Sequence, residues 1–178
     1  MGGQAALSEV SEGDGSCGQR LAALLTCHNR RDQTLRCLSS LATAKEVVSR
    51  RVTVDTFLVD DGCSDGTAAA VRSRFPDVYV IAGTGNLFWC GGMRLAWTHA
   101  AGKDYDGYLW LNDDVTLDHD AIERLVAASS CLSRDDGAVI VVGGTRDDGS
   151  QASTTTTYGG LDEQGVVASS DDVRRIEI

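Results

Sequence analysis

The sequence is poor in positive charge, and this shortage narrows the classes of partner. Its 16 Lys and Arg residues stand against 26 Asp and Glu residues, so the formal net charge is −10 at pH 7. A surface for nucleic acid or for an anionic membrane would need clustered basic side chains. We therefore expect no nucleic-acid partner, and a phosphate-bearing ligand would need a cation or a local arginine to bind.

Long apolar runs and closely paired cysteines are also missing. No apolar run approaches the length that spans a bilayer, and we recognise no secretory signal. The six cysteines include no C-x-x-C pair, so the sequence indicates neither a zinc site nor a disulfide framework. Scattered cysteines of this kind are usually small buried side chains in a reducing compartment. The predicted location is the cytoplasm, either free or peripheral at a membrane, with no transmembrane segment.

What remains is the composition of an ordinary soluble globular chain, with 42% hydrophobic residues, 24% charged residues and a single proline. Its 178 residues suffice for one domain with a real core. Residues 1–19 are rich in Gly, Ser and Glu and lack periodicity, so we predict a disordered tail there. Residues 20–145 are predicted to form the folded domain, and residues 146–178 are more polar.

Strand and helix patterns alternate along the folded part. Short apolar runs predict buried strands at residues 21–25, 52–59, 78–82, 108–111 and 138–142. Helical spacing of apolar residues, capping signals and the stop before Pro76 predict helices between these strands, including one at residues 91–101. This alternation is typical of βαβ units, so we expect an α/β fold with a mainly parallel sheet and helices on both faces.

Three of the predicted strands end in polar clusters, at residues 26–30, 60–65 and 112–114. In a parallel sheet these clusters share one edge, where α/β proteins bind ligands. The last cluster is Asn112-Asp113-Asp114, whose oxygens suit a hard divalent cation that could hold phosphates. Asp61 could accept from a base N–H, and Arg30 could meet a phosphate. Each cluster taken alone is also compatible with a polar turn before a helix.

Together these segments resemble family 2 glycosyltransferases, and most closely the rhamnosyltransferase-like members. The resemblance rests on residues 26–30, on residues 59–67, on Asn86 with Gly91 and Gly92, and on residues 111–114. Their order and spacing match over roughly residues 20–145, most of the chain. The resemblance implies a GT-A fold with a Rossmann-like sheet, a nucleotide-diphosphate-sugar donor such as a UDP- or dTDP-sugar, and Mg²⁺ or Mn²⁺.

The resemblance also implies roles for individual residues. Thr26 and His28 would border the nucleoside, Asp61 would contact the base, and Asp114 would bind the metal. Asn112 stands where the family's D-x-D segment has its first Asp, so it is assigned to the ribose rather than to the metal. The full set predicted to bind the nucleotide sugar is Thr26, His28, Arg30, Asp61, Asn86, Gly92, Asn112 and Asp113.

The implied reaction is transfer of the sugar, with inversion, to a saccharide or lipid-linked acceptor in polysaccharide or glycoconjugate synthesis. Family members continue into an acceptor-binding half that supplies a catalytic Asp or Glu, and residues 146–178 would be the start of that half or a polar tail. No residue here matches the later motif, so we expect a C-terminally truncated enzyme whose catalytic base is unassigned. The alternative is a non-catalytic nucleotide-sugar-binding module or an inactive fragment.

Several single residues are also explained by structural roles that involve no ligand. Asp60 could brace its loop, and Asp65 is as well explained as a helix N-cap. The three tryptophans are better explained by packing than by sugar stacking. A receiver-like signalling domain would need an Asp at the end of the third strand, where the chain has Ala82-Gly83.

Overall fold

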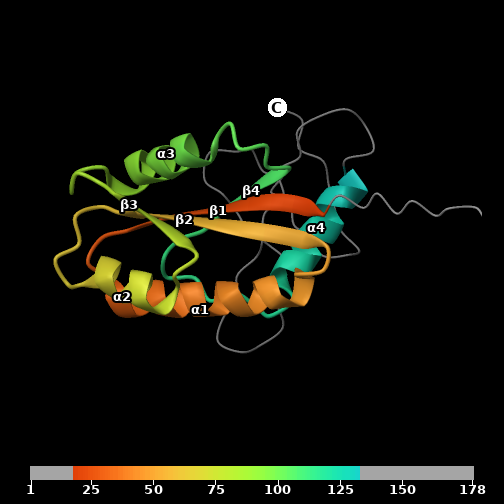
Figure 1. Cartoon of the computed structure of the whole chain (residues 1–178), viewed down its shortest axis with the longest axis horizontal. Coiled ribbons are helices and arrows are strands. Elements are labelled where there is room, and N and C mark those ends of the chain that lie inside the picture. Colours follow the sequence, from red (N-terminus) through yellow and green to blue (C-terminus); the bar gives the residue numbers. More distant parts are fainter. Residues whose placement is uncertain (1–17, 133–178) are drawn as a thin grey trace, which may run out of the picture.

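The computed structural model describes residues 18–132, in which a parallel sheet lies between two layers of helices (Figure 1). The elements in chain order are β1 (Gln19–Cys27), α1 (Arg31–Val48), β2 (Val52–Asp60), α2 (Thr67–Arg74), β3 (Val78–Ala82), α3 (Phe88–Ala100), β4 (Gly107–Trp110) and α4 (Ala121–Leu132). Of the predicted tail at 1–19, the structure describes the last two residues, and Gln19 belongs to β1 rather than to a disordered tail. The rest of that tail, the predicted strand at 138–142 and the region 146–178 lie outside the described residues. Within the described part of the chain, no helix is long and apolar enough to cross a bilayer.

All four strands are parallel, in the order β3-β2-β1-β4. Strand β1 pairs with β2 along its whole length, ending with Cys27 opposite Asp60. On its other side β1 pairs with β4, and the Leu111 N–H then donates to the Leu24 carbonyl at 3.0 Å. The carboxyl ends of β1, β2 and β4 therefore meet at one edge of the sheet, which confirms the predicted α/β fold class.

Strand β1 is the centre of the core because both of its faces are covered. Ala22 and Leu24 point to the layer formed by α3, while Ala23 and Leu25 point to the layer formed by α1, α2 and α4. All four side chains are fully buried, as expected for a strand whose side chains alternate between two covered faces. Figure 1 shows α3 alone on one side of the sheet and the other three helices opposite.

Helix α3 begins three residues before the predicted start at residue 91, and it contains both Gly91 and Gly92. The predicted helix at residues 91–101 already contained this pair, although glycine is a poor helix former. The structure shows a packing reason for Gly92: a Cβ there would lie 2.1 Å from Thr26 Oγ1 and 2.6 Å from Thr26 Cβ. The missing side chain lets α3 cross the end of β1 at close range.

We predict that Gly92→Ala destabilises the protein, because the added methyl overlaps the buried Thr26 and forces α3 away from the sheet. Overpacking of this kind costs about 1–3 kcal/mol. Gly91→Ala is the matched control: its Cβ would meet Leu87 Cβ at 3.1 Å, and it gains helix propensity. The free energy of unfolding in urea checks both variants. Equal stabilities for the two variants would contradict the proposed overlap.

Candidate functional site

At the shared edge, the side chain of Arg30 joins the ends of β1 and β4. Its Nη1 lies 2.9 Å from Asp113 Oδ1 and its Nη2 lies 2.7 Å from Asp114 Oδ2. Arg30 precedes the first turn of α1, and Thr34 in that turn donates to the Arg30 carbonyl at 2.9 Å. One guanidinium thus holds two adjacent carboxylates that follow β4.

The two acids differ in environment. Asp113 is 4% exposed, and burial raises the pKa of its carboxyl above the usual range, while the positive charge of Arg30 opposes the rise. The side chain of Asp114 is 41% exposed and faces solvent. Asp113 is therefore suited to positioning, and Asp114 is the acid that a ligand from solution can reach.

Asn112 is held from the other helix layer. Its Oδ1 accepts from the Trp89 indole N–H of α3 at 2.9 Å. This bond fixes the amide beside the two acids and joins α3 to the end of β4. This contact was not predicted, since nothing in the local sequence pattern pairs residues 89 and 112.

Asp61 lies at the end of β2, where it organises the glycine-rich loop after β3. Its Oδ1 accepts from the Gly85 N–H at 2.7 Å, and its Oδ2 accepts from the N–H groups of Leu87 and Phe88 at 2.9 and 3.1 Å. The residue is only 3% exposed. Both oxygens of the carboxylate that we predicted to contact a base are engaged with the loop backbone, a role that the sequence did not indicate.

His28 and Asn29 connect the end of β1 to the loop after β2. His28 Nδ1 lies 2.5 Å from the Asp61 carbonyl oxygen, and its Nε2 lies 3.1 Å from Asn29 Nδ2. Asn29 Oδ1 accepts from the Ser64 N–H at 2.7 Å. These bonds bring together the polar clusters that follow β1 and β2, as the sequence predicted for strands that end at one edge.

The sequence of the whole chain supplies the deciding observation for this edge. Residues 23–160 match the sequence model of glycosyl transferase family 2. The chain belongs to this family. A comparison with curated proteins finds no match. The family assignment predicted from the four motifs is thus confirmed, and with it the GT-A type of α/β fold and a general activity, transfer of a sugar from a nucleotide-sugar donor.

In this glycosyltransferase the remaining predicted site residues lie around the same edge. Thr26 is buried beneath Gly92, His28 is exposed, and Asn86 is exposed in the loop that Asp61 holds. The structure brings the predicted residues to the edge of the sheet at which β1, β2 and β4 end. Their individual contacts with a nucleotide remain predictions.

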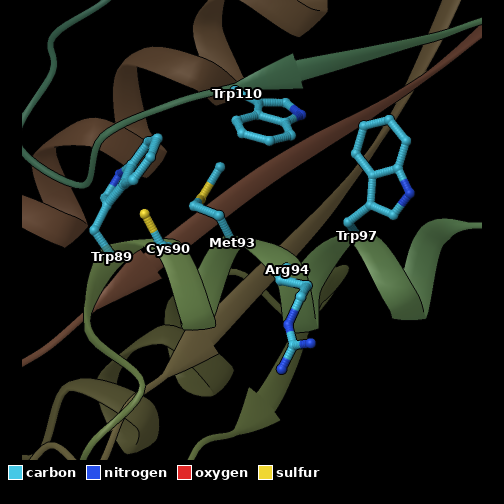
Figure 2. A pocket seen from close by; sticks show the side chains of 6 residues that line it. All are labelled: Trp89, Cys90, Met93, Arg94, Trp97 and Trp110. Carbon is cyan, nitrogen blue, oxygen red and sulfur yellow. The ribbon is translucent and has the colours of Figure 1, made fainter.

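The glycosyltransferase also has an aromatic hollow of about 350 Å³ beside this edge, between α3 and β4. Figure 2 shows its lining, which consists of Trp89, Cys90, Met93, Arg94, Trp97 and Trp110. The rings of Trp89 and Trp97 each pack edge-on against Trp110, with centroids 6.2 and 5.8 Å apart. The tryptophans therefore pack together, as predicted, although between 38% and 50% of each is exposed.

Asp65 joins the starts of two helices. Its Oδ2 accepts from the Arg31 N–H at the start of α1 at 3.0 Å, and its Oδ1 accepts from the Thr67 N–H at the start of α2 at 3.1 Å. The Thr67 hydroxyl donates to the same Oδ1. This is the helix-capping role considered for Asp65 from the sequence, extended to two helices at once.

We predict that Asp65→Asn lowers the free energy of unfolding at neutral pH and that the loss disappears in acid. The hydrogen bond from Thr67, with those from the backbone, lowers the pKa of Asp65 below 3.8. The stabilisation is therefore present above pH 3.8 and is lost as the pH falls through the folded-state pKa. Urea denaturation across this range measures it, with the exposed Asp77→Asn as control. A difference that persists at low pH would show that the charge is not the cause.

Proposed function

We propose that this family 2 glycosyltransferase binds a nucleotide-diphosphate sugar, UDP- or dTDP-linked, along the edge formed by the ends of β1, β2 and β4. The observation that carries the proposal is the grip of Arg30 on Asp113 and Asp114. It marks a place where paired carboxylates hold a positive charge next to solvent. One guanidinium against two carboxylates leaves acidic oxygens for a divalent cation, and such a cation is what an acidic protein needs in order to hold a diphosphate.

The residues present fit a divalent cation. Carboxylate oxygens are the ligands that Mg²⁺ and Mn²⁺ prefer, and the exposed Asp114 can supply one without unfolding its surroundings. Asp114 would hold the metal and Asp113 would support it from the buried side. When bound, the metal would supply Lewis-acid stabilisation of the leaving diphosphate.

Arg30 has a second role in the proposal. A guanidinium binds carboxylates and phosphates through the same forked geometry, so the side chain can exchange the acids for a phosphate group of the donor. It is 45% exposed, which leaves it room to turn. Arg30 would thus offset part of the charge of the acid pair before the donor binds, and part of the charge of the diphosphate afterwards.

The nucleoside would lie over the loops that follow β1, β2 and β3. Thr26, His28, Asn86 and Gly92 belong to this part of the proposed site, and Asn112 would bond the ribose. Asp61 contributes by ordering the loop at residues 85–88, and its contact with the base is kept as a prediction.

We further propose an inverting, rhamnosyltransferase-like transfer to a saccharide or lipid-linked acceptor. Inversion needs a carboxylate that removes the proton of the acceptor hydroxyl as the sugar carbon is attacked. We assign no such base within residues 18–132. The proposal for these residues is therefore donor binding and stabilisation of the leaving group.

Calorimetric titration of UDP and dTDP into the full chain tests the proposal, with Mn²⁺ in one series and a chelator in the other. We expect binding of at least one nucleotide with Mn²⁺ and little or none with the chelator. Hydrolysis or transfer of the matching nucleotide sugar would show an enzyme, and binding without turnover would favour a binding module. Failure of folded protein to bind either nucleotide would overturn the proposed donor site.

A further inference from the structure

A second cluster of ligating side chains lies behind the donor edge and takes no part in the proposed function. Cys27 at the end of β1, Asp60 at the end of β2 and Cys63 in the following loop place their sulfur and oxygen atoms within 4.8 Å of one another. Cys27 is 3% exposed and Cys63 is half-buried. Both thiols are free, so they are available as metal ligands.

From this geometry we infer that Cys27, Asp60 and Cys63 form a site for a soft divalent cation, Zn²⁺, distinct from the hard-cation site proposed at Asp114. The two sulfur atoms are 3.8 Å apart. Two thiolates bonded to one tetrahedral Zn²⁺ at about 2.3 Å lie roughly 3.8 Å from each other. The sulfur atoms therefore already have the separation that the metal requires, and a small movement of the Asp60 carboxylate completes a three-ligand set.

The surrounding backbone supports metal-bound sulfur. The Asn29 N–H donates to Cys63 Sγ at 3.2 Å, a bond that stabilises a thiolate. The Cys63 N–H donates to Asp60 Oδ1 at 2.8 Å, which fixes the carboxylate beside the sulfur. Two of the three ligands are thus oriented by neighbouring backbone groups, as second-layer contacts orient ligands in zinc proteins.

The electrostatics favour a cation over free thiolates. Burial raises the pKa of the Cys27 thiol, with further increases from Cys63, Asp60 and Asp113. Burial also raises the pKa of Cys63. The carboxylates that disfavour thiolates attract a divalent cation.

This site was not predicted from the sequence, because its ligands are not close neighbours in the chain. The two cysteines are separated by 36 positions, so no short spacing announces them. They meet only because β1 and β2 are parallel and end together, with Cys27 opposite Asp60. The earlier expectation that no zinc site is present rested on C-x-x-C spacing alone. Bound zinc would tie the end of β1 to the loop after β2.

Titration of Zn²⁺ and Co²⁺ into the reduced, metal-stripped full chain tests the inference, with excess Mg²⁺ to occupy oxygen-only sites. We expect one Zn²⁺ per chain with a dissociation constant on the order of 1 μM or tighter, and a cobalt–thiolate absorption band. Cys27→Ser and Cys63→Ser should each weaken binding about 100-fold and reduce the band, while Asp60→Asn weakens binding about 10-fold and keeps it. Cys90→Ser, at an exposed cysteine on α3, is the matched control.

A second measurement uses the unaltered chain and so does not depend on the folding of a variant. Zn²⁺ should slow the alkylation of Cys63 while Cys90 reacts at an unchanged rate, as measured by mass spectrometry of the labelled peptides. Asp114→Ala should leave zinc binding intact, which separates this inference from the donor site. Equal zinc binding by the Cys27→Ser/Cys63→Ser double variant, or no protection of Cys63 at saturating zinc, would overturn the inference.

Discussion

Asp114→Ala should abolish metal-dependent binding of the nucleoside diphosphate, with a loss in affinity of about 100-fold or more. Asp114 is the more exposed acid of the pair and the one assigned to the cation. Without it, Asp113 alone must hold the metal, and that carboxylate is buried and bonded to Arg30. The cation would then be bound too weakly to attract a diphosphate to a protein of net charge −10.

The same variant should barely change stability, which allows the two effects to be separated. The Arg30–Asp114 pair is 45% and 41% exposed, and exposed ion pairs contribute about 0–1 kcal/mol. Calorimetry with Mn²⁺ measures affinity, and urea denaturation measures stability. Asp77→Ala, at an exposed acid before β3 and far from the carboxyl edge, is the matched control. Metal-dependent nucleotide binding that survives in Asp114→Ala would move the cation to other ligands.

Regular structure was predictable wherever the pattern is local. The strand at 78–82 was placed at its observed bounds, and the strand at 52–59 was one residue short, because each is a short apolar run next to turn residues. The parallel direction of the strands followed from the alternation of strands and helices, whereas their order in the sheet was not predicted. The start of α3 was wrong because Phe88 begins the helix with a positive φ of 53°, which no local propensity predicts.

The site was predictable at the level of motifs and much less so at the level of contacts. The motifs placed Arg30, Asp61 and the acids at 113–114 at one edge, since parallel strands end together. The sequence did not reveal that Arg30 bonds to both acids, 83 and 84 positions away. Contacts of this range depend on the path of the backbone between elements, and the local sequence does not specify that path.

The adjacent acids Asp60 and Asp61 also have contacts that the local sequence does not specify. Asp60 and Asp61 look equivalent in the sequence, yet β2 ends at Asp60 and the chain turns at Gly62, which has a φ of +72°. Asp60 accepts from one backbone N–H, of Cys63, and remains partly exposed. Asp61 is buried and accepts from three. The turn after the strand gives the neighbours different roles.

Asp61→Ala should therefore be among the most damaging single changes, with a loss of about 3–5 kcal/mol in the free energy of unfolding. The N–H groups of Gly85, Leu87 and Phe88 would lose a charged acceptor in a buried place. Asp61→Asn retains one acceptor oxygen, which can serve Gly85 or the other pair but not both. The free energy of unfolding of Asp61→Asn should therefore lie between the values for Asp61→Ala and for the wild-type protein. Urea denaturation followed by circular dichroism measures all three proteins.

Asp60→Ala is the control that isolates the number of hydrogen bonds from the charge, because it removes a neighbouring carboxylate that accepts from one backbone N–H. In metal-free protein it should cost about 1 kcal/mol. Similar losses for Asp60→Ala and Asp61→Ala would mean that the loop after β3 does not depend on Asp61. A folded Asp61→Asn protein that loses only nucleotide affinity would instead identify the carboxylate as a base contact. If only the Asp61 variants lose much free energy of unfolding, then one buried carboxylate stabilises the loop after β3 and with it the proposed donor site.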